Sequence, residues 1–273
     1  MPAQPNAQAF YLGSNQITSS TDTVISATAA LPLLIDDVIF PCDIDSSRIL
    51  GSDWSGGTIE TLRLAGQSVM ASNKAMPLSA FAVENASRLE AVRSLGLTID
   101  TNQSFTATYG APTGLTISSA QPLAMALSTS PTDVVISPNN APGGLLNFCF
   151  GMGTATIGEG ASSTFEATSL RDAVFLGAMV GDYSWEAGTV NKSPSQIVIT
   201  SIEADGIELL SNSNPTTEPL NFMAILAAAA DQSGLELNYL LSQNSLFRVT
   251  VKNNHASKDV TIALGAFCRP LNV

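Results

Sequence analysis

Charged side chains are scarce in this chain of 273 residues, where Asp, Glu, Lys and Arg together make up 12%. That share is about half of ordinary usage. Only 11 residues are Lys or Arg, and the formal net charge is −12. Because proteins neutralise nucleic-acid phosphates with Lys and Arg, this composition argues against direct binding to nucleic acid. So few charges are typical of a subunit surface that is covered by neighbours, although secreted β proteins share the same composition.

Histidine is nearly absent, with His255 as the single example, in the polar segment 252–258. Zinc sites and cupin-type metal sites need two or more histidines close together, so both are excluded. A Ser-His-Asp triad would have to use His255, and the sequence has no GxSxG motif to supply the serine. We therefore interpret His255 as a solvated turn residue and expect no catalytic residue, no cofactor and no dedicated metal site.

Cysteine is also sparse, and the three residues are Cys42, Cys149 and Cys268. An odd number without a CxxC motif indicates neither a disulfide framework nor a zinc site, so we expect buried free thiols in a reducing compartment. The first residues lack the basic and apolar regions of a signal peptide. The longest aliphatic stretch, Phe222 to Ala230, is too short to span a bilayer. These features predict a soluble protein that is made in a cytoplasm.

Two polar segments are candidates for ligand sites. Asp36, Asp37, Asp43 and Asp45 lie close together in the sequence, and carboxylates that gather on a loop can hold Ca²⁺. No EF-hand spacing is present, so Ca²⁺ binding and a solvated loop both stay open for these residues. The glycine-rich stretch 151–160 has no Lys in position and no predicted helix after it, which excludes a phosphate-binding loop.

Alternation of apolar and polar residues dominates the sequence, and Gly, Pro, Asn and Ser interrupt it at short intervals. This pattern is typical of a β-sandwich or β-barrel. The clearest strands are predicted at residues 58–64, 196–202, 246–251 and 259–264. Two Ala-rich segments, 80–93 and 219–231, have no Gly or Pro in their interior and predict short helices.

The two predicted helices occupy matching places in an internal repeat. Setting Gly66 against Gly206 brings apolar residues into correspondence on both sides. The matched pairs are Ile59 with Ile199, Leu62 with Ile202, Val69 with Leu209, and Met70 with Leu210. Residues 102–105 then match 244–247, and Phe10-Tyr-Leu-Gly resembles Phe148-Cys-Phe-Gly. The order of these matches indicates a duplicated β unit, and a single irregular sandwich with accidental self-similarity is the alternative.

The turn-rich segment 138–144 marks the seam between the two copies. We therefore predict an N-terminal arm at 1–9, a first domain at 10–140 and a second domain at 145–273. Trp54 and Trp185 each precede the alternating strand of their copy. They anchor packing within the domain or, alternatively, lie at subunit contacts, where aromatic residues are enriched.

This arrangement resembles the double jelly-roll major capsid proteins of tailless icosahedral viruses, including membrane-containing bacteriophages. The resemblance is one of architecture and covers nearly the whole chain, without a short identifying motif. It implies an all-β fold of two tandem antiparallel eight-stranded jelly-roll sandwiches, each with a short helix in an inter-strand loop. The chain is short for this family, so minimal loops are expected.

The resemblance also implies a function. The chain would be a structural major capsid protein, not an enzyme, that is assembled in the host cytoplasm and located in the virion. Its trimers would have a pseudo-hexagonal outline and tile an icosahedral shell. The implied partners are other copies of the chain, neighbouring capsomers, other virion proteins and, where the virion has one, an internal membrane. No direct contact with nucleic acid is expected.

Three other classes remain as alternatives. A tandem carbohydrate-binding or adhesin module predicts a monomer with an aromatic platform. A duplicated cupin-type enzyme is disfavoured by the single histidine. A minor or spike protein of a virion, or a capsid protein with one jelly roll and a projection, predicts one copy of the helix-strand pattern where this sequence shows two.

Overall fold

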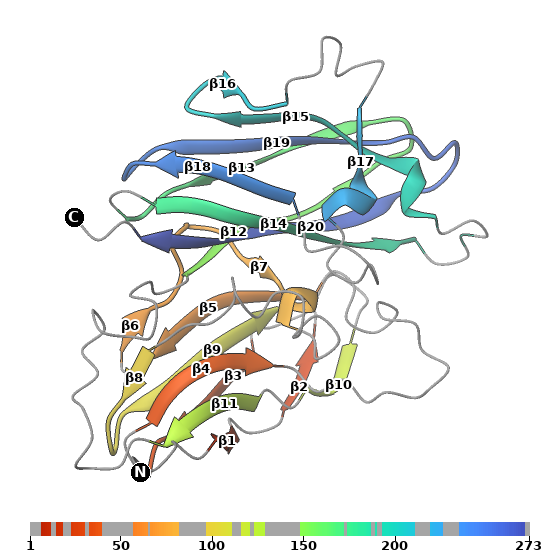
Figure 1. Ribbon diagram of the computed structural model, residues 1–273. Helices are drawn as coiled ribbons and strands as arrows, with labels where there is room; N and C mark the ends of the chain where they lie inside the picture. Colours follow the sequence, from red (N-terminus) through yellow and green to blue (C-terminus); the bar gives the residue numbers. More distant parts are fainter. Residues whose placement is uncertain are drawn as a thin grey trace.

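A computed structural model describes residues 7–11, 15–18, 23–30, 33–39, 57–64, 66–81, 97–110, 116–120, 123–128, 148–171, 174–186, 189, 193–210, 219–225 and 235–270. Alternating sequence patterns in these residues form antiparallel strands, as predicted. The strands gather into two stacked bodies, one from each half of the chain (Figure 1). No helix in this part of the chain is long and apolar enough to cross a membrane.

The second half of the chain forms two facing antiparallel sheets. The first sheet has the order β12 (Phe148–Ile157), β20 (Val260–Pro270), β14 (Val174–Trp185) and β18 (Leu235–Leu241). The second has the order β13 (Ser162–Thr168), β19 (Leu246–Asn253), β15 (Ile197–Ala204) and β16 (Ile207–Glu208), and β17 (Leu220–Asn221) also pairs with β15. Two 3-10 helices, η3 (Pro194–Gln196) and η4 (Phe222–Ile225), complete this half. The chain alternates between the two sheets in the manner of a jelly roll.

The first half repeats this strand order. One sheet has the order β1 (Ala7–Tyr11), β11 (Leu123–Ser128), β4 (Leu33–Ile39) and β8 (Leu97–Ile99). The other has the order β3 (Thr23–Thr28), β9 (Ser104–Gly110), β5 (Thr58–Leu64) and β6 (Gln67–Ser68), and β7 (Met76–Pro77) also pairs with β5. The remaining strands β2 (Asn15–Thr18) and β10 (Thr116–Ala120) pair with each other. The prediction of an all-β fold with jelly-roll sandwiches is confirmed.

Backbone conformation repeats together with the strand order. Gly66 and Gly206 have positive φ angles of 79° and 80°, in the turns β5–β6 and β15–β16. Asn102 and Asn244 have φ angles of 67° and 66°, in the turns before β9 and β19. A left-handed conformation at a non-glycine residue is uncommon, so its recurrence at matched positions is strong support for the duplication. The alignment of Gly66 with Gly206 is thus confirmed.

The predicted helices differ from what the structure shows where it describes them. Leu78–Phe81 and Phe222–Ile225 form single 3-10 turns, η1 and η4. Leu220–Asn221, which the Ala-rich pattern placed in a helix, is strand β17, because its backbone pairs with Val198 and Ile199 of β15. Residues 82–93 and 226–231 lie outside the described residues, as does the predicted seam. Strand β1 begins at Ala7, within the segment predicted as an arm.

The core of the second half lies between its two sheets. Phe150 of β12 meets Phe247 of β19 edge to face, with ring centroids 6.1 Å apart. The outer face of the β12–β20–β14–β18 sheet is covered as well, because every residue of β20 from Ile262 to Cys268 is buried. A strand that is buried at both alternating positions has neighbours on both faces of its sheet. The second neighbour is the first half of the chain.

Candidate assembly interface

Among the described residues, much of the contact between the two halves is made by residues 68–77 of the first half, which we term the docking segment. Its residues 69–71 pair with the edge strand β12, and Met76 and Pro77 lie over Gly265 on the outer face of the β12–β20–β14–β18 sheet. Figure 1 shows β7 between the two bodies. Each of the five described sheets contains strands from one half alone, and the isolated bridges Met70–Cys149 and Ser72–Ser169 cross between halves. The edge of the first half is thus joined to a sheet of the second half.

Backbone hydrogen bonds hold the docking segment along its length. The Ala71 amide donates to the Cys149 carbonyl at 2.8 Å, and the Cys149 amide donates to the Val69 carbonyl at 3.0 Å. Further along, Leu170 donates to Ala71 and Gly153 donates to Ala75, at 2.8 and 2.9 Å. A segment fixed by backbone pairing has a defined register against its partner, so the contact is specific in geometry.

Two glycines make this close approach possible. A Cβ atom added at Gly151 would overlap the backbone of Lys74 and Ala75, and one added at Gly265 would overlap the Met76 side chain. The same Cβ at Gly265 would lie 2.9 Å from Cδ of Pro77. Glycine inside a strand is typical of a place where another backbone approaches closely. The close approach of the docking segment therefore explains why positions 151 and 265 are glycines, without a phosphate-binding loop.

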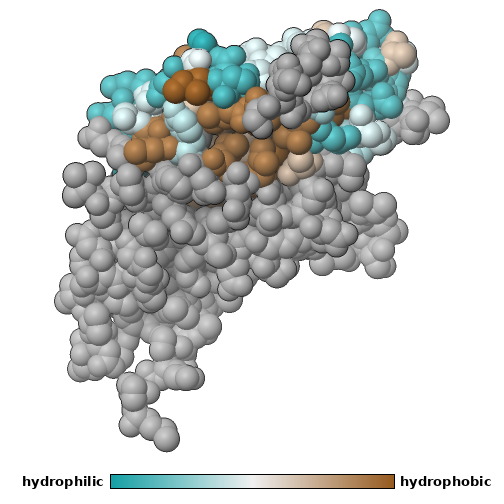
Figure 2. All heavy atoms as spheres, turned by 45° about the horizontal axis from the view of Figure 1, so that its top comes forward, coloured by the Kyte–Doolittle hydropathy of each residue, from teal (hydrophilic) through white to brown (hydrophobic). Residues whose placement is uncertain are grey.

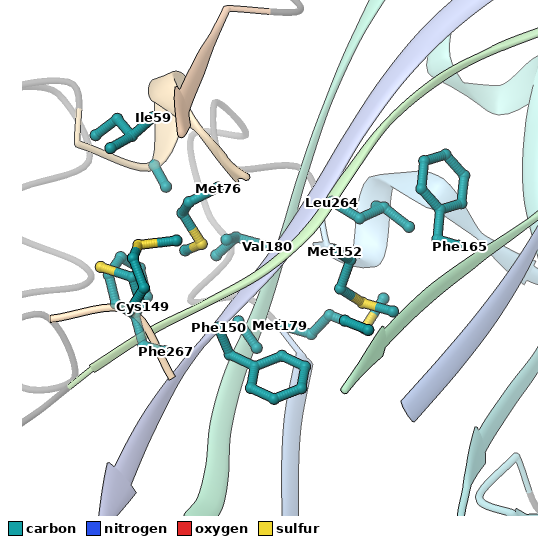
Figure 3. Close-up of a cluster of buried hydrophobic side chains, with 14 of the residues drawn as sticks. Ile59, Met76, Cys149, Phe150, Met152, Phe165, Met179, Val180, Leu264 and Phe267 are labelled. Carbon is teal, nitrogen blue, oxygen red and sulfur yellow. The ribbon is translucent and has the colours of Figure 1, made fainter. Parts of the chain in front are cut away.

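Apolar side chains fill the space under the docking segment. Figure 3 shows Met76, Cys149 and Phe267 on the side of the second-half sheet that faces Ile59 of the first half. On the opposite side of that sheet, Met152 and its neighbours point into the second-half core. Met76 and Cys149 have no exposed surface. Burial of a Met side chain stabilises a contact by about 1.5–3 kcal/mol.

Polar groups at the contact find partners across it. The buried Ser72 hydroxyl donates to the Gly151 carbonyl at 2.5 Å. The Thr168 amide donates to Oδ1 of Asn73 at 3.2 Å. Arg171, whose pKa is lowered by burial, donates from its guanidinium to the Ser68 carbonyl. Buried polar groups cost stability when they lack partners, so these bonds favour this arrangement of the halves over looser ones.

A hollow of about 500 Å³ opens beside the docking segment, and Glu60, Lys74 and Glu166 contribute its charged lining. The two carboxylates already have partners. Glu60 accepts a hydrogen bond from Thr58 at 2.6 Å, and Glu166 forms an ion pair with Arg248 at 2.7 Å. The residues that line the hollow include no histidine, cysteine or serine that could act as a nucleophile or base. The hollow is a polar part of the contact between the two halves.

The structure places His255 against Trp185, with ring centroids 5.0 Å apart. The Ser257 amide donates to its Nδ1 at 3.3 Å. His255 lies in the turn between β19 and β20, as expected, and its side chain is half-buried against Trp185. Trp185 is buried and packs within its own half, with its ring centroid 6.3 Å from that of Tyr183. This agrees with the interpretation of Trp185 as an anchor of packing within the domain. Trp54 lies outside the described residues.

The other residues singled out in the sequence do not form a ligand site where they are described. Cys149 and Cys268 are buried and are not joined by a disulfide. Asp36 and Asp37 lie in strand β4, whereas Cys42, Asp43 and Asp45 lie outside the described residues. Within the part of the chain that the structure describes, no group of three His, Cys, Asp or Glu residues could hold a metal ion.

Sequence reasoning missed the docking segment. Residues 68–77 lack a charge pattern or motif, and their role depends on what lies opposite them in space. One signal was present, because Gly151 and Gly265 lie inside the apolar stretches 148–152 and 262–268. Such glycines indicate close backbone contact, although they do not identify the partner.

Comparison with known proteins finds a likeness in structure but not in sequence. No protein-family model matches the sequence, and no curated protein matches it. Among solved structures, the chain is similar to the major capsid protein P2 from bacteriophage PM2, with 8% sequence identity and a TM-score of 0.40. The alignment covers 98% of this chain and 99% of that one. The jelly-roll assignment depends on the strand order and register of this chain alone.

Proposed function

We propose that this chain is a structural capsid protein that assembles into homotrimers, which in turn tile the shell of an icosahedral virion. One observation carries the proposal: two jelly-roll halves of identical strand order are joined edge to sheet within one chain. A chain with two similar bodies side by side gives a trimer six similar corners. Six-cornered units suit hexagonal tiling, and repeated heterologous contacts of this kind build closed shells.

The composition agrees with this role. With 12% charged residues, the chain is poor in the groups that keep an isolated surface soluble. Its net charge of −12 disfavours contact with bare nucleic acid. We therefore place its inner partners among other virion proteins or an internal membrane, and its location in the virion after assembly in the host cytoplasm. The domain boundaries 10–140 and 145–273 are part of this proposal.

The test is the oligomeric state of the purified full-length chain at tens of micromolar, measured by native mass spectrometry and multi-angle light scattering. We expect a species of three times the 28.3 kDa chain mass. Electron microscopy of the same sample should show particles with a six-cornered outline. A strictly monomeric protein would contradict the proposal and favour the tandem binding-module alternative, which predicts a monomer.

A further inference from the structure

The second half contains a counterpart of the docking segment, residues 208–210 and 219–221, with the same local structure. The Leu209 amide donates to the Ile202 carbonyl at 2.7 Å, as the Val69 amide donates to the Leu62 carbonyl at 2.9 Å. Strand β17 pairs with β15 as β7 pairs with β5. The two segments are therefore built in the same way from the same strands.

A side-chain acceptor shapes both segments at the same point. The Leu210 amide donates to Oε1 of Glu208 at 2.9 Å, and the Met70 amide donates to Oγ of Ser68 at 3.1 Å. Glu208 also accepts from the Ser201 hydroxyl and the Ile202 amide, at 2.6 and 3.0 Å. Leu209 and Leu210 are thus held in the conformation that Val69 and Met70 use for docking, before any partner is present.

The two segments differ in what covers them. Val69, Met70 and Met76 are 1%, 5% and 0% exposed, because the second half lies on them. Their counterparts Leu209, Leu210 and Leu220 are only partly buried within the chain. Next to them Ile207 is 57% exposed. On the face of the second half that Figure 2 presents, apolar side chains gather between hydrophilic ones.

The first half contains a counterpart of the sheet that receives the docking segment. The β1–β11–β4–β8 sheet has the order of the β12–β20–β14–β18 sheet. Ala9 pairs with Met125 in it at the place where Cys149 pairs with Phe267, next to β-bulges that lie at matching positions in the two sheets. The sequence match of Phe10 with Phe148 is therefore two residues out of register. Strand β11 reads Leu-Ala-Met-Ala-Leu, which is apolar at both alternating positions, like the doubly covered β20. Such strands are typical of sheets with neighbours on both faces.

We propose that the counterpart segment of the second half docks on the β1–β11–β4–β8 sheet of another copy of this chain, in the same geometry that joins the two halves within a chain. Among the described residues, the bridges that dock one half on the other join the first-half segment to Cys149 of β12 and to Ser169 after β13. A contact between unlike surfaces links copies head to tail and forms a ring when the rotation closes. This inference depends on the proposed trimer and names its interface.

The closest pair of residues can be predicted from the contact inside the chain. Met70 forms a β-bridge with Cys149 there. The matching pair between copies is Leu210 of one copy and Ala9 of the next. Paired strands lie about 4.8 Å apart, which is within the range that a disulfide spans. The double variant A9C/L210C should therefore form a disulfide between copies, whereas M70C should form one with Cys149 inside the chain.

The experiment is mild oxidation of the full-length variants followed by non-reducing electrophoresis. We expect A9C/L210C to give covalent dimers and trimers, at about tenfold the yield of the matched control V24C/L210C, because docking raises the local thiol concentration to millimolar values. Val24 is 57% exposed and lies in β3, which belongs to the other sheet of the first half. The single variants A9C and L210C should stay uncrosslinked. Variant M70C should lose two hydrogen masses and remain a monomer on the gel.

Failure of this inference and failure of the proposed function give different results. If native mass spectrometry shows trimers but A9C/L210C crosslinks no better than V24C/L210C, the trimer forms through another surface and the inference is wrong. If the unmodified chain is a monomer at tens of micromolar, the proposed function itself fails. Intermolecular crosslinks that vanish on addition of excess unmodified chain would support exchangeable docking at this site.

Discussion

The docking segment and its counterpart are built alike but have different surroundings. Both follow a turn with a left-handed glycine, Gly66 or Gly206, and both place an apolar residue beside a bulged central strand. In the first half the apolar residues of the segment are buried by the second half. In the second half the same construction is only partly buried. Local sequence therefore sets the shape of the segment, whereas its burial depends on what lies opposite.

This difference shows how duplication changes a surface. A contact between two halves of one chain forms at an effective concentration set by the connecting chain, so it needs little affinity. The same contact between copies must also overcome the loss of translational and rotational freedom. A duplicated interface can therefore form fully inside one chain, whereas between chains it forms only at sufficient protein concentration. Substitutions in the two segments separate these two situations.

The largest effect is expected from Gly151→Val, which breaks the covered contact. The added side chain would overlap the backbone of Lys74 and Ala75, which cannot move without losing the hydrogen bonds of the docking segment. We expect the free energy of unfolding to fall by about 3 kcal/mol, at the upper end of overpacking effects. Urea unfolding followed by tryptophan fluorescence measures this change.

The matched control for that experiment is Gly158→Ala. Its added Cβ would meet only Oδ1 of Asp259, at 3.8 Å, which is an ordinary contact. We expect its stability to lie close to that of the unmodified chain. If Gly151→Val is no less stable than Gly158→Ala, the docking segment does not hold the two halves together.

A second, smaller difference is expected between Met76→Ala and Leu220→Ala, which occupy matching places opposite Ile59 and Ile199. Met76 is fully buried, so its truncation should cost about 2 kcal/mol in any state of assembly, the lower end of the range for a buried Met. Leu220 is partly buried within the chain, so its truncation should cost less in the monomer. If copies dock there, the cost should grow with protein concentration, since assembly stabilises only the folded chain.

The measurement is the urea midpoint of each variant at micromolar and at tens of micromolar concentration. Met76→Ala should show the same deficit at both concentrations. Leu220→Ala should show a larger deficit at the higher one. A Leu220→Ala deficit that does not change with concentration, in a sample that forms trimers, would remove Leu220 from the interface.

The sequence predicted the fold well because its signals are local and periodic. Alternation identified the strands around Ile59, Ile199 and Val249, and the glycine alignment located two turns that share the same positive φ angle. The helix prediction at Leu220 was wrong because Ala-rich composition describes an isolated segment. In the folded chain, Leu220 and Asn221 pair with the backbone of β15, and this pairing would be lost if they were helical.

The candidate interface could not be predicted in the same way. Val69, Met70 and Leu209 are ordinary apolar residues in the sequence, and their roles depend on contacts between distant segments. His255 shows the same limit, because the residue beside it in space, Trp185, is 70 positions away in the chain. Gly151 is the exception, since a glycine within an apolar strand indicates a close neighbour even when that neighbour is unknown.

The smallest effect is expected from acid, and it concerns one half alone. Burial acts to raise the pKa of Glu208, but hydrogen bonds from Ser201 and from the amides of Leu210, Ile202 and Leu209 outweigh it, so the pKa lies below its ordinary value of 4.5. A carboxyl with a lowered pKa in the folded chain stabilises it above the unfolded pKa. That contribution is lost as the pH falls through the lowered value. The matching residue Ser68 does not titrate, so the docking segment should not respond to this change.

We therefore expect the amides of Leu209 and Leu210 to lose protection against hydrogen exchange below about pH 4.5, relative to Val69 and Met70, after correction for the intrinsic exchange rate. The substitution Glu208→Gln should reproduce the loss at neutral pH, with a cost in stability below about 1 kcal/mol because the group is largely exposed. The exposed Glu159→Gln in the β12–β13 turn serves as control. Equal acid sensitivity of the two segments, or an unchanged Leu210 amide in Glu208→Gln, would show that Glu208 does not preform the counterpart segment, which would then have to become ordered when another copy binds.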